Sequence, residues 1–228
     1  MSAPIAERPR RDVVRHTVID SVVELIRNDI LDGVLAPGTE LPEIPLAERY
    51  GVSRRTVRQA IDVLDRVGLV RHEQHKRTTV TELTPGTVRD LYQVRRTLES
   101  AGADACTSCS DVALANLRRD FQALEHATTL GDARALIEAD LRFHQGVVRL
   151  IGSQRMDRFF DDIAGEMLFA IAVLESVHHE AAVRPADALA EHEAILTALL
   201  ERDAERARSL VVEHANINER LLLDIVLP

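Results

Sequence analysis

The stretch PGTELPEIPLAERYGVSRRTVRQAIDVLDRVGLV, residues 37–70, holds the clearest fold signals in this chain. Pro37 and Gly38 predict a turn, because this pair punctuates secondary structure strongly. The segment IPLAERY then predicts a short helix with Pro45 at its start, where a missing N–H costs little, and with Gly51 at its end. Ser53 is a favourable N-cap for the next helix, 54–66, whose expected buried face is Val57, Ile61 and Leu64.

The flanking residues extend this pattern. Apolar residues recur with helical spacing from Val18 to Ile30, and Gly33 predicts the end of that helix. Beyond Gly68, residues 69–83 are β-branched at both ends and basic in the middle, which predicts a hairpin. The order helix, helix, turn, helix, hairpin over residues 16–82 predicts a winged helix-turn-helix. Its third helix would enter the major groove and its hairpin would lie along the backbone.

Net charge is distributed unevenly along the chain. The 228 residues carry a formal charge of −9. Residues 1–82 hold 13 basic and 13 acidic side chains, whereas residues 83–228 hold 15 basic and 24 acidic ones. Within the first part, residues 49–77 carry eight basic side chains against three acidic ones. This local excess of positive charge predicts a surface that faces phosphates, inside a protein that is otherwise acidic.

Composition excludes several classes of protein. Apolar residues make up 46% and aromatic residues only 3% of the chain, which favours packed helices over aromatic-rich strands. No run approaches 18 apolar residues, so no membrane partner is expected, and no secretory signal is evident. Two cysteines, Cys106 and Cys109, make no disulfide framework and favour the cytoplasm. Residues 1–15 lack periodicity and predict a flexible arm.

The second part of the chain predicts a helical domain over residues 83–228. Thr84 and Pro85 mark a linker and the start of a new helix, and strand signals are missing beyond them. We expect an antiparallel all-α bundle, so the fold class is mainly α. Its six approximate helices are 86–107, 111–129, 132–151, 154–178, 185–201 and 204–225.

The third helix and the wing carry the expected DNA contacts. An arginine in the first turns of the helix can fork onto guanine O6 and N7 or onto phosphate. The alternative is an ordinary solvated helix face, but the turn before the helix and the hairpin after it favour DNA binding. The candidate residues are Arg54, Arg55, Thr56, Arg58 and Gln59 on the helix and His75, Lys76 and Arg77 in the wing.

Residues 83–228, the acidic part of the chain, contain a pattern of possible metal ligands. Asp140 and His144 are four residues apart and share one helical face. His192 and His214 each lie 11 residues from Asp203, in the turn between the last two helices, and an antiparallel hairpin puts such residues at the same height. One carboxylate and three imidazoles suit zinc, nickel or another divalent first-row metal. By spacing alone, four unrelated polar side chains are an equally good interpretation.

Residues 37–70 resemble the winged-helix signature of the GntR family of bacterial transcriptional regulators. The pattern P-G-x-x-L-x-E-x-x-L-A-x-x-x-G-V-S-R-x-x-V-R-x-A is met at nearly every position. The resemblance implies that Arg54 and Arg58 contact DNA. Two departures bear on this: Ile44 stands where relatives commonly carry a polar residue, and the wing tip, residues 74–77, lacks their glycine.

The segments DLRFH, EHEAILTALLERDAERARSLVVEH and VRDLYQVRRTLES resemble the effector-binding domain of the FadR-like subfamily. The resemblance implies that Asp140, His144, His192 and His214 bind a divalent metal, zinc above all. Arg95 falls where the subfamily has an arginine that faces the cavity, and there it would bind a small carboxylate effector bidentately. A salt bridge to Glu99 is the alternative for this arginine.

Three functions follow as hypotheses. The first is a transcriptional regulator, more specifically a repressor, that binds operator DNA as a homodimer and responds to a small carboxylate bound with the metal. In the second, the metal only holds the fold. The third is a metalloenzyme, but no general base or nucleophile stands out near the ligands, and an attached winged helix has no role in such an enzyme. The sequence therefore predicts a regulator rather than an enzyme.

Overall fold

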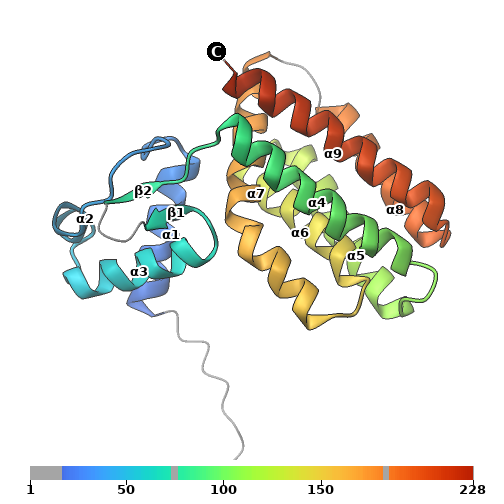
Figure 1. Ribbon diagram of the computed structural model, residues 1–228, viewed down its shortest axis with the longest axis horizontal. Coiled ribbons are helices and arrows are strands. Elements are labelled where there is room, and N and C mark those ends of the chain that lie inside the picture. The colour runs from blue at the N-terminus through green and yellow to red at the C-terminus, as the bar shows by residue number, and fades with distance from the viewer. Residues whose placement is uncertain (1–16, 73–76, 182–184, 228) are drawn as a thin grey trace, which may run out of the picture.

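The computed structural model describes residues 17–72, 77–181 and 185–227, with side chains outside 176–187 (Figure 1). Two groups of elements are visible. The first contains three helices and a two-stranded antiparallel sheet in which Val70 pairs with Val80 and His72 with Thr78. In chain order its elements are α1 (Val18–Leu31), α2 (Glu43–Tyr50), α3 (Arg54–Arg66), β1 (Val70–His72) and β2 (Thr78–Val80). This is the winged helix-turn-helix that the sequence predicts.

Local signals fix most ends of these helices. The Ser53 side chain accepts a hydrogen bond from the backbone N–H of Thr56, and Gly51 ends α2 in the left-handed conformation with φ 65°. The expected start of α2 is wrong. This helix begins at Glu43 after an extended Pro42, so Pro45 is its third residue. The first turn still tolerates a proline, because N–H groups there have no intrahelical acceptor.

The second group is an antiparallel helical bundle, as the sequence predicts. Thr84 caps its first helix, which begins at Pro85. The six helices in the described part are α4 (Pro85–Ala105), α5 (Asp111–Leu130), α6 (Ala133–Arg149), α7 (Gln154–Ala181), α8 (Pro185–Leu200) and α9 (Ala204–Val226). In Figure 1, α4 and α9 run side by side, and α6 packs against α4, α5 and α7. No helix among the described residues is both long and apolar enough to span a membrane.

The two groups of elements contact each other through α6 and α7. Phe169 of α7 packs into the core of the winged helix, which is built from Val22, Ile26, Val57 and other apolar residues. The backbone N–H of Gly165 donates to the carbonyl of Val67, the residue that ends α3, at 2.7 Å. A side chain at position 165 would overlap that carbonyl, so this close approach requires glycine.

Two ion pairs join α6 to α1. Arg27 lies 2.9 Å from Glu138, and Arg134 lies 3.0 Å from Asp32. Both bundle residues precede Asp140 on the same helix. A displacement of α6 therefore changes contacts with the winged helix directly.

Candidate functional site

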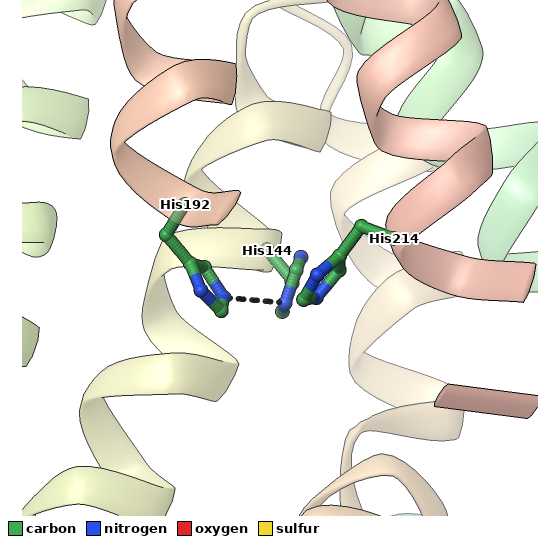
Figure 2. A group of neighbouring side chains, drawn as sticks. All are labelled: His144, His192 and His214. Carbon is green, nitrogen blue, oxygen red and sulfur yellow. Dashed lines mark hydrogen bonds between the residues drawn. The ribbon is translucent and has the colours of Figure 1, made fainter. Parts of the chain in front are cut away.

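Three histidine imidazoles converge between α6, α8 and α9 (Figure 2). His144, His192 and His214 each offer a nitrogen, and these nitrogens lie within 4.8 Å of one another. All three residues are buried. The ring centroids of His192 and His214 are 4.6 Å apart. The hairpin of α8 and α9 thus brings the two histidines to one height, as their equal distance from Asp203 predicts.

Hydrogen bonds fix the orientation of two of these rings. The Nδ1 atom of His144 lies 2.9 Å from a carboxylate oxygen of Glu99, and the Nδ1 atom of His192 lies 2.7 Å from the carbonyl of Ala188. Each acceptor requires an Nδ1–H donor. Both Nε2 atoms therefore point to the centre of the cluster, where they are 3.2 Å apart.

Asp140 joins the cluster through two of the three imidazoles. Its Oδ1 atom lies 3.1 Å from Nε2 of His192, and its Oδ2 atom lies 3.5 Å from Nε2 of His144. The spacing of four residues on α6 accounts for the second contact. The structure thus brings together the four residues that the sequence singles out, with the carboxylate beside His144 and His192.

The third imidazole has its own partners. Nδ1 of His214 donates to the carboxylate of Glu191 at 2.8 Å, and its Nε2 accepts from the amide of Asn218 at 3.0 Å. Neither Glu191 nor Asn218 is among the residues that the sequence patterns single out. The sequence positions could have indicated both partners. Asn218 is four residues beyond His214 on the same helix, and Glu191 adjoins His192, which faces His214.

Arg95 lies at the edge of the cluster and is 1% exposed. Its Nε donates to Glu99 at 2.7 Å, and its Nη2 donates to Nε2 of His144 at 2.7 Å. The salt bridge that the spacing of four residues allows is therefore present. The same guanidinium also contacts His144, a metal-ligand candidate, while the binding of a carboxylate effector by Arg95 stays a prediction. Glu99 binds Arg95 and His144 together.

Burial and ion pairing shift the pKa values of these groups in opposite directions. Burial raises the pKa of Glu99, but the ion pairs with His144 and Arg95 outweigh it and leave the pKa at about 2. Burial likewise opposes the ionised form of Asp140, yet His192 and His144 hold the pKa of that carboxyl below its usual value. Burial and the nearby cations lower the pKa of His214, whereas Asp140 raises that of His192 against the effect of burial.

The space around the cluster is small on one side and open on the other. A cavity of about 20 Å³, enough for about one water, borders Asp140, Glu175 and His192. A groove of about 380 Å³ between α8 and α9 reaches His214. Its lining includes Glu191 and Glu213, so it attracts cations from the surface towards the cluster.

This donor set fits a divalent metal. Three imidazoles and one carboxylate are the nitrogen and oxygen ligands that zinc and nickel prefer. Glu99, Ala188 and Glu191 bind the outer nitrogens of the rings in the way that partners of metal-bound histidines do. A bound metal would replace the hydrogen bonds that Nε2 of His144 accepts from Arg95 and Nε2 of His214 accepts from Asn218.

The candidate DNA residues of α3 lie on its accessible side. Arg54, Arg55, Arg58 and Gln59 are exposed. Thr56 is partly buried, and its hydroxyl lies 2.9 Å from that of Ser53. This hydroxyl is therefore part of the N-cap of α3. The opposite face, with Val57, Ile61 and Leu64, is buried as expected. The guanidinium groups of these arginines therefore lie at the surface, where those of Arg54 and Arg58 pair with Glu43.

The candidate residues of the wing are described only in part. Arg77 is exposed and pairs with Glu40. His75 and Lys76 lie outside the described residues. Ile44 is 51% exposed on α2, so an apolar side chain does stand at the surface where relatives carry a polar one.

Comparisons with known proteins match both parts of the chain. The family model described as "Bacterial regulatory proteins, gntR family" matches residues 18–80. The model of the FCD domain matches residues 90–216. The first range covers the winged helix and the second covers the helices that carry the histidine cluster.

Relatives and solved structures agree with these matches. An uncharacterized HTH-type transcriptional regulator in an unstable DNA locus of Streptomyces ambofaciens is 30% identical over 83% of this chain and 78% of its own length. The transcriptional repressor RspR of Escherichia coli is 23% identical over 86% of this chain and 85% of its own.

A GntR transcriptional regulator from Rhodococcus sp. RHA1 has the same fold. Its crystal structure is 25% identical, covers 90% of this chain and 97% of its own, and superimposes with a TM-score of 0.74. These relatives are transcriptional regulators rather than enzymes, which confirms the expectation of a regulator and speaks against the metalloenzyme hypothesis.

Proposed function

Because this chain belongs to the GntR family of bacterial transcriptional regulators and carries an FCD domain behind its winged helix, we propose that it is a repressor controlled by a metal-assisted carboxylate effector. Residues 16–82 bind operator DNA, and residues 83–228 bind the effector and form the homodimer. Residues 1–15, which the sequence predicts to be an arm, lie outside the described residues. A regulator of bacterial DNA works in the cytoplasm, which is the location we propose.

DNA binding rests on the charge and exposure of α3 and the wing. Arg54, Arg55, Arg58 and Gln59 read base edges or bind phosphates from the exposed side of α3. Thr56, His75, Lys76 and Arg77 complete the proposed contact set. One winged helix reads few base pairs, so a homodimer on a pseudo-palindromic operator fits this mode of reading.

The convergence of three imidazoles and Asp140 is the observation that carries the proposed metal site. His144 and His192 turn their Nε2 atoms towards one point because their Nδ1 atoms are engaged elsewhere, and a metal at that point would displace the bond from Arg95 to His144. Asp140 adds the negative charge that a divalent cation needs. Zinc is the metal that this ligand set suits best, and nickel or another first-row ion is the next choice.

The effector site is proposed beside Arg95. The guanidinium is buried, lies against His144, and stacks at 5.3 Å over the ring of Tyr92. The Tyr92 hydroxyl is buried and makes no hydrogen bond among the described residues. Glu99 and His144 already bind Nε and Nη2 of Arg95, so a small carboxylate would use the remaining guanidinium donors and the Tyr92 hydroxyl. When bound, the metal would supply a Lewis acid for a further carboxylate oxygen.

The contacts of α6 and α7 with the winged helix support the proposed control of DNA binding. Asp140 and His144 lie on α6, and Glu138 of the same helix binds Arg27 of α1. A shift of α6 that accompanies ligand binding therefore strains this pair and its neighbours. The direction of control follows the relative named a repressor.

A test uses the purified full chain. A duplex that the protein binds is first selected from a randomised pool. The dissociation constant for this duplex is then measured by fluorescence anisotropy with zinc, and with zinc plus mono-, di- and tricarboxylates. At least one carboxylate should weaken DNA binding tenfold or more, and Arg95→Met should abolish that response. A dissociation constant that no carboxylate changes would contradict the proposed effector control.

A purely structural metal is the second candidate function. The burial of the cluster and the cavity of about 20 Å³ beside it favour this alternative, because a structural site is closed. Under it, zinc raises the melting temperature but leaves the DNA dissociation constant of the folded protein unchanged. Measuring the melting temperature and the DNA dissociation constant with a chelator, with zinc, and with zinc plus carboxylates separates the two functions.

A further inference from the structure

The two principal arginines of α3 share one carboxylate. Arg58 donates from Nε and Nη2 to the two oxygens of Glu43, at 2.6 and 2.8 Å. Arg54 donates from Nη2 to the same carboxylate at 3.3 Å. The side chain of Glu43 is 24% exposed, whereas those of Arg54 and Arg58 are 60% and 61% exposed. The carboxylate thus lies underneath the two guanidinium groups.

This arrangement follows from how α2 and α3 pack. Glu43 is the first residue of α2, and α2 lies against α3. Arg54 and Arg58 are one turn apart and face the same side. Arg55 lies on a different side and makes no hydrogen bond or ion pair within the described residues. The carboxylate of Glu43 therefore pairs with Arg54 and Arg58 but not with Arg55.

We propose that Glu43 is a positioning residue for the recognition of DNA sequence. Its carboxylate orients the guanidinium of Arg58 and restrains that of Arg54 before DNA binds. The inference rests on the proposed DNA binding by α3. Glu43 occupies Nε–H and one N–H of Nη2, so the remaining donors of Arg58 point away from the protein. Those donors form the fork that matches O6 and N7 of guanine.

The charge of Glu43 adds a second effect. Hydrogen bonding to Arg58 lowers the pKa of Glu43, so the carboxylate is ionised at neutral pH. It reduces the combined charge of Arg54 and Arg58 from two to one and thereby weakens the attraction to phosphates of any sequence. The oriented donors of Arg58 strengthen contacts with specific bases, while the lower combined charge weakens contacts with DNA of any sequence. Both effects raise the ratio of specific to non-specific affinity.

The wing repeats this pairing. Glu40 precedes α2 and pairs with Arg77, and residues 40 and 79 form a β-bridge. Three of the four candidate arginines that the structure describes thus bind a glutamate from residues 40–43. This segment restrains the orientations of basic side chains on both sides of the proposed DNA face.

The experiment compares the wild type with Glu43→Gln and with Glu48→Gln as a matched control. Glu48 is exposed on the same helix and makes no ion pair within the described residues, so its variant has the same charge change. Each protein selects duplexes from a randomised pool. Fluorescence anisotropy then measures its affinity for the duplex that the wild type selects and for the unselected pool. Glu43→Gln should lower the ratio of the two affinities about tenfold and steepen the salt dependence of pool binding by up to about one charge. Glu48→Gln should stay within about twofold of the wild type.

The outcomes separate this inference from the proposed function. If the wild type selects no sequence, the proposed reading of DNA by α3 fails. If the wild type selects a sequence and Glu43→Gln selects it with the same affinity ratio, the positioning role of Glu43 is overturned. If Glu43→Gln does not melt like the wild type, Glu43→Asp replaces it. That variant keeps the charge but shortens the reach to Arg58, so it should lower the affinity ratio while leaving the salt dependence unchanged.

Discussion

The Nε2 atoms of His144 and His192 face each other across 3.2 Å at the centre of the helical bundle. Each ring donates from Nδ1 to an oxygen on its other side. Nε2 of His144 accepts from Arg95 at 2.7 Å. A proton on Nε2 of His192, which makes that ring a cation, therefore separates the two nitrogens. Asp140, 3.1 Å from Nε2 of His192, favours that positive charge and raises the pKa of this histidine. A metal that enters must therefore displace a proton.

The first prediction concerns removal of one ligand. Zinc at 100 times its dissociation constant should stabilise the wild type by about 2.7 kcal/mol, which raises the melting temperature by about 5–10 °C. In His192→Ala this rise should nearly vanish, because the cluster loses an imidazole and the partner of Asp140. Calorimetry with zinc and with a chelator measures the difference. His126→Ala, an exposed histidine on α5, is the control and should keep the full rise. A zinc-dependent rise that survives in His192→Ala would contradict the assignment of the ligands.

The second prediction concerns the buried pair of Arg95 and Glu99. Glu99→Gln leaves a buried guanidinium without its counter-charge, so it should lower the free energy of unfolding by about 3–5 kcal/mol. The double variant Arg95→Met/Glu99→Gln removes both charges and should recover most of that loss. Urea unfolding of the zinc-free proteins measures both effects. A double variant no more stable than Glu99→Gln alone would show that the pair is not the origin of the loss.

The third prediction concerns pH. Burial, with a smaller contribution from Asp140, raises the pKa of Glu175 from 4.5 to about 7. The folded state therefore binds more protons than the unfolded state between these two values, so Glu175 lowers stability as pH rises from about 4.5 to about 7. Glu175→Gln should be more stable than the wild type at pH 8 by on the order of 2 kcal/mol, with little difference at pH 4.5.

The measurement of this pH effect is unfolding of chelator-treated protein at both pH values, since a cation near Asp140 would reduce the shift. Glu125→Gln, at an exposed position on α5, is the control. A stability difference between Glu175→Gln and the wild type that is equal at pH 4.5 and pH 8 would rule out titration of this carboxyl as its cause.

Much of the fold could be predicted because its signals are local. Ser53 caps α3, Gly51 ends α2, and Thr84 with Pro85 starts α4, and each of these choices depends on a few neighbouring residues. The start of α2 was wrong because proline is acceptable anywhere in the first turn, so Pro45 does not fix the first residue.

The site could be predicted only where helical spacing or the turn at Asp203 relates its residues. Asp140 and His144 share a helix face, and His192 and His214 share a hairpin. Glu99 is related to Arg95 by spacing, but its bond to His144 depends on how α4 packs against α6. The pairing of Glu43 with Arg58 and of Arg27 with Glu138 joins elements distant in sequence, and no periodicity encodes such contacts.

The fourth prediction concerns the contact between the bundle and the winged helix. Gly165 lies inside α7, where alanine is intrinsically better than glycine by about 1 kcal/mol. Gly165→Ala should therefore leave the bundle folded, while its Cβ overlaps the carbonyl of Val67 and separates the two parts. Because that contact lies at the end of α3, thermal unfolding should split into two transitions, and the carboxylate that weakens DNA binding by the zinc-loaded wild type should lose its effect.

Gly86→Ala is the matched control for this separation. Its Cβ would meet only the Thr84 hydroxyl, at 3.8 Å, which is ordinary contact. Zinc affinity, measured by competition with a chromophoric chelator, should stay within about twofold in both variants, because neither residue belongs to the histidine cluster. If the carboxylate still weakens DNA binding by zinc-loaded Gly165→Ala as it does in the wild type, the signal does not pass through the contact of α7 with Val67. The packing of Phe169 into the winged helix and the ion pairs of Arg27 with Glu138 and of Asp32 with Arg134 would then remain as routes between the two parts.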